Sequence, residues 1–383
     1  MVAAVHMGKA PPALPALRAE IGLSLVGAGW VVSLFNVTGG VLGLVAGTFG
    51  DRFGSRRVVV YGLVALAAGS LAGAFAHSPW LLLGGRFLEG LGFIAVATAA
   101  PGMIVAATRL GDLRLALGAW STYMPAGSAA AMVLAPLLLV GLGWRGVWVA
   151  AALLALVWAV LLLCCMPPDR PHHERTDGAS LLRNIVLTVT RPGPWVLALA
   201  FGCYTIQWVS LMVWLPTFLV EQRGLAIGSA SVLTALVIAG NVPGNLLGGW
   251  LLHRHLARWK LIALSGVGMI VCLAAIFGTL LPDTLRYLAC LAFSCVGGML
   301  PAAVLSGAPV VAPSSAQIAT TNGLLIQGSN AGQMIGPPAL AWLVTLTADW
   351  QSGYWLLQGA AVAVVALAWV YRRVERRLLP ATA

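Results

Sequence analysis

Two opposite charges stand inside one of the apolar stretches of the chain. Arg86 and Glu89 lie in the segment from Trp80 to Ala107, which is otherwise uncharged. A spacing of three residues puts both side chains on one face of a helix, where they can pair. The carboxylate of such a pair can carry a proton and the guanidinium can attract an anion. The alternative is an ion pair that only ties this helix to its neighbours.

His6 and Lys9 add two charged or titratable groups to the apolar start of the chain, Met1–Ala10. Lys9 can help to hold an anion, and a histidine titrates near neutral pH. The alternative for Lys9 is that its long stem carries the ammonium group to a membrane interface. This apolar run stops at Pro11-Pro12, far short of a membrane thickness. We therefore expect a partial first helix that ends near Pro15 and whose beginning is absent from the sequence.

Polar and aromatic side chains recur in other apolar segments, and we expect several of them to contact a small polar solute. Such side chains orient a bound solute or merely hydrogen-bond one helix to another, and for any single residue the second role is favoured. Together with His6 and Lys9, the candidates are Tyr123, Tyr204, Gln207, Trp208, Asn241, Gln327 and Asn330.

The cysteines and histidines do not predict a metal site or an enzyme. All six cysteines lie inside apolar segments, and none has the spacing of zinc ligands. His172 and His173 are a lone pair in a charged stretch. We expect no metal ion, no cofactor and no enzymatic activity.

The composition places these residues in a membrane protein. Of 383 residues, 60% are hydrophobic and only 9% are charged, and the mean hydropathy is +0.92. Soluble domains average about 25% charged residues, so a soluble or disordered protein is excluded. One span with its connection takes roughly 30 residues, which predicts about a dozen crossings. Long unbroken apolar runs exclude a transmembrane β-barrel.

The apolar runs predict an all-α, polytopic protein with eleven full transmembrane helices and the partial first helix. The predicted spans are 21–50, 58–77, 80–107, 115–141, 146–166, 194–219, 230–252, 261–281, 287–311, 318–346 and 350–371. The polar stretch 167–192 divides an N-terminal bundle, 1–166, from a C-terminal bundle, 193–383, that ends in a basic tail. Gly47–Arg52 and Gly249–Arg254 end corresponding spans of the two bundles, which indicates a parallel internal repeat with a solute site between the copies.

The net charge of +11 follows the predicted topology. Sixteen basic residues fall on the side that holds the 167–192 loop and the C-terminal tail, against four on the opposite side. By the positive-inside rule the first side, with the C-terminus, is cytoplasmic, in a plasma or bacterial inner membrane. The charge therefore does not indicate a nucleic-acid partner. The expected partners are the lipid bilayer, a small-molecule solute and protons, and we expect a monomer.

The run Gly47-Thr-Phe-Gly50-Asp51-Arg52-Phe-Gly54-Ser55-Arg56-Arg57 closely resembles the G-x-L-A-D-R-x-G-R-R signature of the major facilitator superfamily. In that family the signature lies in the cytoplasmic loop between helices 2 and 3. The glycines permit close approach and a tight turn, and Asp51 can pair with arginines while a cytoplasmic gate is shut. The resemblance implies a gate motif made of Gly47, Asp51, Arg52, Gly54 and Arg56, whereas Ser55 departs from the pattern. A plain basic loop is the alternative.

A second match lies on the predicted helix 4. Gly85-Arg86-Phe-Leu-Glu89-Gly90-Leu-Gly92 is similar to the family pattern R-x-x-Q-G-x-G, with Glu in place of Gln. The antiporter signature G-P-x-x-G-G is absent from the sequence of helix 5, which favours uptake. The runs Pro12–Leu17 and Trp214–Leu219 are loosely similar to the cyanate and nitroimidazole transporter branch.

The resemblance implies two six-helix bundles and alternating access. We expect a secondary active transporter of a small anionic or polar organic solute, with proton-coupled uptake through Glu89 and Arg86. The alternatives are an uncoupled facilitator, an efflux transporter of the same fold, or a membrane sensor derived from a transporter. A channel and a membrane-embedded enzyme are disfavoured.

Overall fold

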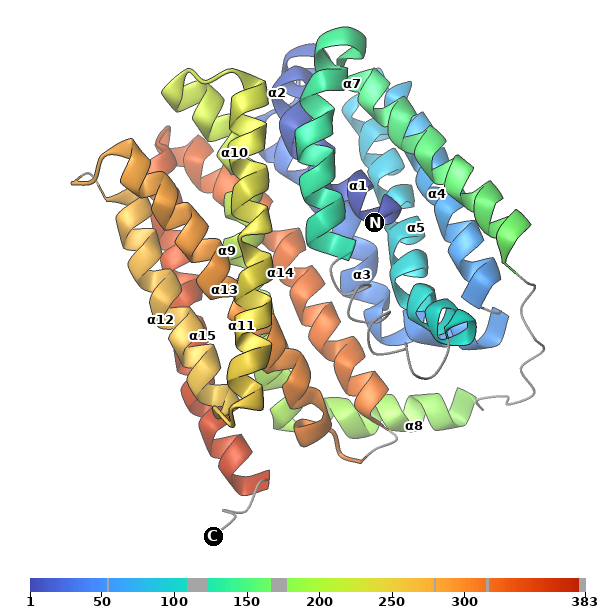
Figure 1. Ribbon diagram of the computed structural model, residues 1–383, viewed down its shortest axis with the longest axis vertical. Helices are drawn as coiled ribbons and strands as arrows, with labels where there is room; N and C mark the ends of the chain where they lie inside the picture. Colours follow the sequence, from blue (N-terminus) through green and yellow to red (C-terminus); the bar gives the residue numbers. More distant parts are fainter. Residues whose placement is uncertain (54, 109–122, 167–177, 279, 315–316, 379–383) are drawn as a thin grey trace. The chain divides into compact units, whose positions relative to one another are not determined.

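The structure is a computed structural model of the whole chain. It describes all residues except 54, 109–122, 167–177, 279, 315–316 and 379–383, and it does not describe the side chains of 42–53, 101–102, 105–107, 178–181, 319 and 378. The described residues form helices and connections without any β-strand, so the predicted all-α class is confirmed (Figure 1).

The helices follow the predicted apolar runs closely. The N-terminal part contains α1 (Val2–Gly8), α2 (Ala10–Ile21), α3 (Leu25–Phe53), α4 (Ser55–Ala74), α5 (Pro79–Ala107) and α7 (Tyr123–Cys165). The C-terminal part contains α8 (Gly178–Val189), α9 (Pro192–Arg223), α10 (Ile227–Ala239), α11 (Asn241–His253), α12 (Arg258–Phe277), α13 (Asp283–Val311), α14 (Ile318–Thr347), the 3₁₀ turn η2 (Trp350–Ser352) and α15 (Gly353–Leu378). Among the described residues, eight stretches are long and apolar enough to cross a membrane.

The first helix does not end near Pro15, so that prediction is wrong. Lys9 joins α1 to α2 with right-handed helical dihedral angles, and α2 runs through Pro15 to Ile21. Pro11 lies in the first turn of α2, where a missing N–H costs no hydrogen bond. Pro15 removes a single helical bond without ending the helix. The helix ends at Gly22, whose φ of 72° is left-handed, a conformation that glycine adopts without strain.

The described parts of two predicted spans belong to one long element. Residues 123–165 are assigned to α7, but Gly143 has φ 65° and ψ −177°, which breaks the helix. The break separates the predicted spans 115–141 and 146–166. The predicted span 230–252 is likewise built from α10 and α11, which meet at Gly240 and together form one stretch of 27 residues.

Glycines let α4 and α5 approach each other closely. A Cβ atom at Gly69 would lie 2.5 Å from the carbonyl oxygen of Gly85, and one at Gly85 would lie 2.6 Å from that of Gly69. No side chain fits at either position. The two backbones therefore meet one turn before Glu89 on α5, which brings this carboxylate against α4.

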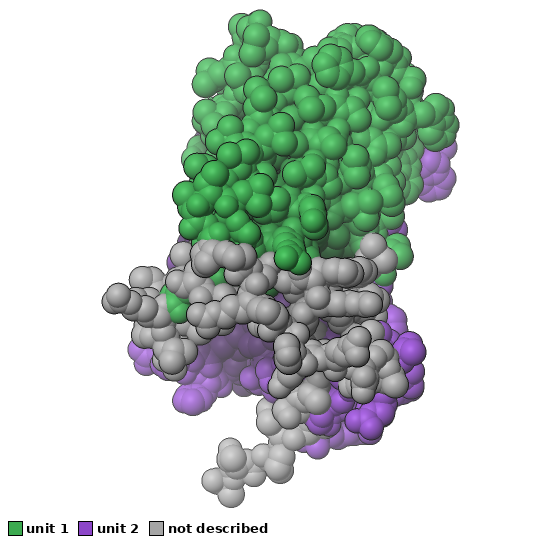
Figure 2. All heavy atoms as spheres, turned by 90° about the vertical axis from the view of Figure 1, so that its right-hand side faces the viewer, with its two compact units in different colours: residues 1–175, 213–239 green, residues 176–212, 240–383 purple. Residues whose placement is uncertain are grey.

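The chain divides into two compact units, coloured green and purple in Figure 2. Unit 1 comprises residues 1–175 and 213–239, and in it α5 packs against α3 and α4 while α7 packs against α1 and α4. Unit 2 comprises residues 176–212 and 240–383, and in it α13 packs against α11 and α12 while α15 covers α12. The division into bundles 1–166 and 193–383 stays a prediction, and residues 167–177 of the predicted central loop lie outside the described residues.

Candidate functional site

Four side chains that the sequence singled out meet inside unit 1. His6 from α1, Lys9 at the junction of α1 and α2, and Arg86 and Glu89 from α5 form what we call the charged cluster. Their exposed fractions are 0%, 1%, 0% and 0%. Ionised groups are rarely enclosed so completely unless they are paired, so the contacts within the cluster decide its chemistry.

Glu89 is the centre of the charged cluster. Its Oε1 atom accepts a hydrogen bond from Lys9 Nζ at 2.5 Å and lies 3.0 Å from His6 Nδ1. Its Oε2 atom pairs with the Nη1 atom of Arg86 one turn earlier on α5. The expected pairing of residues 86 and 89 is thus present, and two further residues join it.

Lys9 is held from three directions. Besides Glu89, its ammonium group donates to Ser70 Oγ at 2.5 Å, and Ser70 in turn donates to the carbonyl oxygen of Trp148 at 2.8 Å. The ammonium nitrogen also lies 4.6 Å from the centroid of the Trp148 ring, a cation–π contact. Lys9 therefore does not extend to a membrane interface. The sequence does not single out Ser70, because a serine among small apolar residues carries no distinguishing pattern.

Arg86 links α5 to two other helices through backbone oxygens. Its Nε donates to the carbonyl of Val31 on α3 at 2.7 Å, and its Nη1 donates to the carbonyl of His6 at 2.9 Å. The guanidinium carbon lies 4.7 Å from the ring centroid of Phe35. These two hydrogen bonds and the contact with the Phe35 ring hold the planar guanidinium in place beside Glu89.

The charged cluster carries one more positive than negative charge. With His6 neutral, two cations, Lys9 and Arg86, face the carboxylate of Glu89. Among the described residues, His6 Nε2 and Arg86 Nη2 are buried without a hydrogen-bond partner. A buried surplus cation with an unused donor on Arg86 can take up an anion, and the carboxylate can take up a proton.

A second polar group lies in unit 2. Asn241 Nδ2 donates to the hydroxyl of Tyr204 and to the carbonyl of Ser294, both at 3.0 Å. Trp208 Nε1 donates to Ser294 Oγ at 2.9 Å. The structure thus brings together Tyr204, Trp208 and Asn241, and it adds Ser294, which the sequence analysis missed. We call these four residues the polar network.

The remaining solute-contact candidates do not join either group through a described hydrogen bond. Gln207 and Asn330 donate to the carbonyls of Cys203 and Ile326, one turn earlier in their own helices. The Oε1 atom of Gln327 has no partner among the described residues. The ring of Tyr123 lies 6.4 Å from that of Phe93 on α5, between centroids.

The predicted gate motif lies mostly outside the described residues. Gly54 is not described, and neither are the side chains of Asp51 and Arg52, although α3 includes Gly47 and extends to Phe53. Arg56 is described, and its Nη2 donates to the carbonyl of Leu163 near the end of α7 at 2.7 Å.

Comparison with known proteins assigns the family. Residues 1–326 match the model of the Major Facilitator Superfamily. The chain belongs to this superfamily. It is therefore a multi-pass membrane transport protein and not an enzyme.

Two curated relatives match over most of the chain. The probable sulfoacetate transporter of Cupriavidus necator is 23% identical over 379 residues, covering 93% of this chain and 87% of the relative. The cyanate transport protein of Escherichia coli is 29% identical over 270 residues, covering 68% of this chain and 66% of the relative. The second match lies in the branch that the loose similarity of Pro12–Leu17 and Trp214–Leu219 indicated.

A solved structure supports the superfamily fold. The crystal structure of a bacterial homologue of the human lysosomal transporter Spinster, titled as inward-facing and unoccupied, has a TM-score of 0.77 at 17% identity. The match covers 98% of this chain and 95% of the other. At this identity the likeness concerns the fold alone.

Proposed function

We propose that this transporter takes up a small organic anion together with protons, and that the charged cluster couples the two. The observation that carries the proposal is the buried surplus cation of Lys9 and Arg86 around the single carboxylate of Glu89. The bound solute contributes the negative charge that the cluster lacks. The unused Nη2 donor of Arg86 supplies a hydrogen bond to it.

Charge balance makes the coupling reciprocal. Protonation of Glu89 raises the charge of the cluster from +1 to +2, and this strengthens the attraction for an anion. By thermodynamic linkage, a bound anion favours protonation of Glu89 to the same extent. An anion and a proton would therefore enter the cluster together and leave it together, which is the requirement of a symporter.

The names of the two relatives support an anionic solute. Sulfoacetate and cyanate, the solutes in those names, are anions at neutral pH. The polar network of unit 2 is a further candidate for solute contact, because its amide and hydroxyl groups can hydrogen-bond carboxylate or sulfonate oxygens. Replacing Asn241 with Ala tests that contact through the KM for uptake.

The first experiment measures proton movement in proteoliposomes that hold the full chain and an internal pH-sensitive dye. The liposomes are challenged with sulfoacetate, cyanate and a neutral sugar. We expect internal acidification with one of the anions and none with the sugar. Glu89→Gln should abolish gradient-driven uptake and keep solute exchange, since exchange needs the anion site but no net proton movement.

The matched control is Asp283→Asn, which removes an exposed carboxylate at the start of α13 in the other unit. This variant should keep both uptake and exchange. Loss of exchange together with uptake in Glu89→Gln would show that the residue holds helices together and does not couple protons.

A second candidate function is uncoupled, facilitated uptake. Arg86 donates hydrogen bonds from two of its nitrogens to the backbone oxygens of Val31 and His6. This arrangement is that of a structural link between α5, α3 and α1. Saturable uptake without acidification, equal in the wild type and in Glu89→Gln, would favour this function.

We also propose a plasma-membrane location, with a cytoplasmic C-terminus, and a monomeric protein. The distribution of basic residues along the sequence supports the orientation. The gate role of Asp51 and its neighbouring arginines is proposed on the sequence motif alone.

A further inference from the structure

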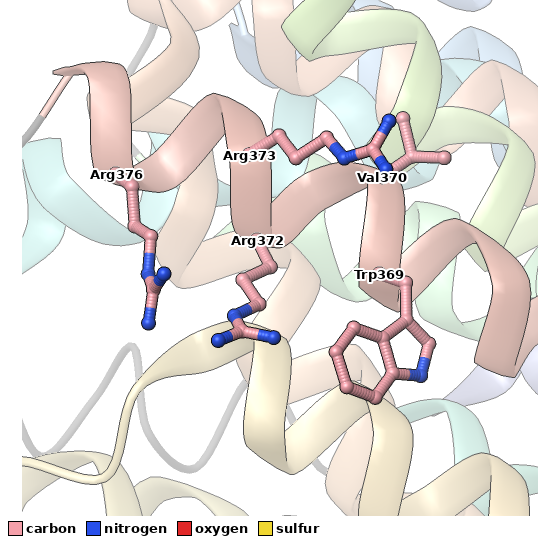
Figure 3. Close-up of a pocket in the computed structure, with 5 residues that line it drawn as sticks. All are labelled: Trp369, Val370, Arg372, Arg373 and Arg376. Carbon is pink, nitrogen blue, oxygen red and sulfur yellow. The ribbon is translucent and has the colours of Figure 1, made fainter.

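A basic pocket lies at the C-terminal end of α15, away from the charged cluster in the sequence. Its cavity volume is about 390 Å³, and its lining residues are Trp369, Val370, Arg372, Arg373 and Arg376 (Figure 3). Positions 369, 372, 373 and 376 recur at the three- and four-residue spacing of one helix face. One aromatic and three cationic side chains therefore share a single surface.

Arg372, one of the lining residues, contacts two indole rings. Its guanidinium carbon lies 4.9 Å from the ring centroid of Trp259 on α12 and 5.0 Å from that of Trp369, and the two indole rings are 5.7 Å apart. In Figure 3 the guanidinium of Arg372 and the indole of Trp369 lie side by side. Stacking orients the guanidinium without using its hydrogen-bond donors. The Nε atom of Arg372 is buried and has no partner within the described part of the chain.

None of the described residues that line the pocket is acidic. Glu375 is the nearest carboxylate in the sequence, but it is occupied by Arg258 at 3.4 Å and by the backbone N–H of Trp259 at 3.4 Å. Among the described residues, Arg372, Arg373 and Arg376 form no ion pair. Three arginines with free donors make a strong site for an anion with several oxygens.

The surroundings of the pocket are those of a membrane boundary. Trp369 and Val370 are 52% and 45% exposed, and Val362, two turns earlier on α15, is 53% exposed. An apolar helix surface that passes into tryptophan and then arginine is typical of the level of lipid headgroups. A ligand in this pocket would have its anionic part on the arginines and an apolar part along α15.

We propose that this pocket binds the phosphate headgroup of an anionic phospholipid, with an acyl chain against Val362 and Val370. The three arginines would donate to the phosphate oxygens, and Trp369 would lie at the glycerol level. The site is independent of the transported solute, and its test does not depend on which solute is carried.

The test titrates the purified full chain in detergent with dioleoyl-phosphatidylglycerol or dioleoyl-phosphatidylcholine and counts bound lipid by native mass spectrometry. We expect preferential retention of phosphatidylglycerol. The triple variant Arg372→Gln/Arg373→Gln/Arg376→Gln should lower its apparent affinity by about tenfold or more, since each basic residue near a charged lipid surface contributes measurably. Phosphatidylcholine binding should not change.

The matched control is the triple variant Arg183→Gln/Arg191→Gln/Arg254→Gln, which removes the same charge from three exposed residues outside the pocket. It should leave phosphatidylglycerol binding within about twofold of the wild type. Arg376→Gln alone is a second variant in case the pocket triple aggregates. This side chain is exposed and in no described ion pair, so the variant should fold and show a smaller loss in the same direction.

Three results would overturn the proposal. Equal losses in the two triple variants would mean that binding follows net charge and not the pocket. Equal retention of the two lipids by the wild type would mean that the pocket does not select an anionic headgroup. Displacement of phosphatidylglycerol by an equal concentration of glycerol 3-phosphate would mean that the pocket takes a soluble phosphate, without the acyl chain.

Discussion

At the scale of single residues, the chemistry of this transporter centres on the charge balance around Glu89. Lys9, Arg86 and His6 all contact its carboxylate, and none of the four side chains is more than 1% exposed. Removing one partner of a buried ion pair leaves an uncompensated charge, which costs more than the pair itself contributes. The identity of the removed partner should therefore determine how far the free energy of unfolding falls.

Glu89→Gln should lower the free energy of unfolding by about 3–5 kcal/mol, because it leaves Lys9 and Arg86 facing each other without a carboxylate. Lys9→Met should cost less, because Arg86 and Glu89 remain a balanced pair. Adding Lys9→Met to Glu89→Gln should recover part of the loss, since it restores a cluster charge of +1. Thermal unfolding of the four proteins in detergent measures these differences. A Lys9→Met variant that is less stable than Glu89→Gln would contradict the charge-balance argument.

At the scale of elements, the close approach of α4 and α5 positions the cluster, and adjacent glycines on α5 test it. A Cβ atom at Gly85 would meet the carbonyl of Gly69 at 2.6 Å, whereas one at Gly84 would meet nothing within 4 Å. Alanine favours a helix over glycine by up to about 1 kcal/mol at either position. Only at position 85 must the two helices also move apart.

Gly85→Ala should therefore destabilise the protein by about 1–3 kcal/mol and reduce transport, because it displaces Arg86 and Glu89 from their partners. Gly84→Ala should be neutral or slightly stabilising and keep transport. Thermal unfolding and uptake in proteoliposomes measure the two effects. Similar behaviour of the two variants would exclude backbone contact as the feature that positions Glu89.

A contact between α2 and α7 should depend on pH. Glu20, at the end of α2, accepts a hydrogen bond from Trp144 Nε1 at 2.5 Å and pairs with Arg145. The hydrogen bond from Trp144, the larger cause, and that from Arg145 hold the pKa of the Glu20 carboxyl below its ordinary value of 4.5. The carboxylate form is thus favoured in the folded state, so its stabilisation is present above pH 4.5 and is lost as the pH falls through the lowered pKa.

Glu20→Gln should reduce the Tm by about 1–2 °C at pH 7, a small effect because Glu20 and Arg145 are both partly exposed. The difference between variant and wild type should shrink at acidic pH, where the wild-type carboxyl is protonated as well. Thermal unfolding across this pH range follows the difference. A Tm difference between variant and wild type that stays constant throughout the acidic pH range would show that the ion pair does not stabilise the folded protein.

At the scale of the whole molecule, the basic residues predict how the chain lies in the membrane. A green fluorescent protein fused after Ala383 should fluoresce, whereas an alkaline phosphatase fused at the same place should be inactive, because both report a cytoplasmic C-terminus. Phosphatase activity at this position would show that the orientation is the reverse of the predicted one. The gate motif and the pocket on α15 would then both lie on the side of the membrane opposite to the cytoplasm.

Features that depend on neighbouring residues were predictable from the sequence. The all-α class and most spans follow from the length and hydropathy of continuous runs, which act within one helix. The pairing of Arg86 with Glu89 also follows, because a three-residue spacing is set by helix geometry. The extension of α2 beyond Pro15 was not predicted, because proline within a helix is tolerated when packing stabilises the surrounding turns.

Only the tertiary structure decided which distant residues meet. Lys9 and Glu89 are 80 positions apart, and Tyr204 and Asn241 are 37 apart, so no local period relates them. Ser70 accepts a hydrogen bond from Lys9 of the charged cluster, and Ser294 accepts one from Trp208 of the polar network. Helix packing places each hydroxyl beside a buried N–H that would otherwise lack a partner. Hydropathy determined that these helices lie in a membrane, and close packing of the helices determined which polar groups they bury together.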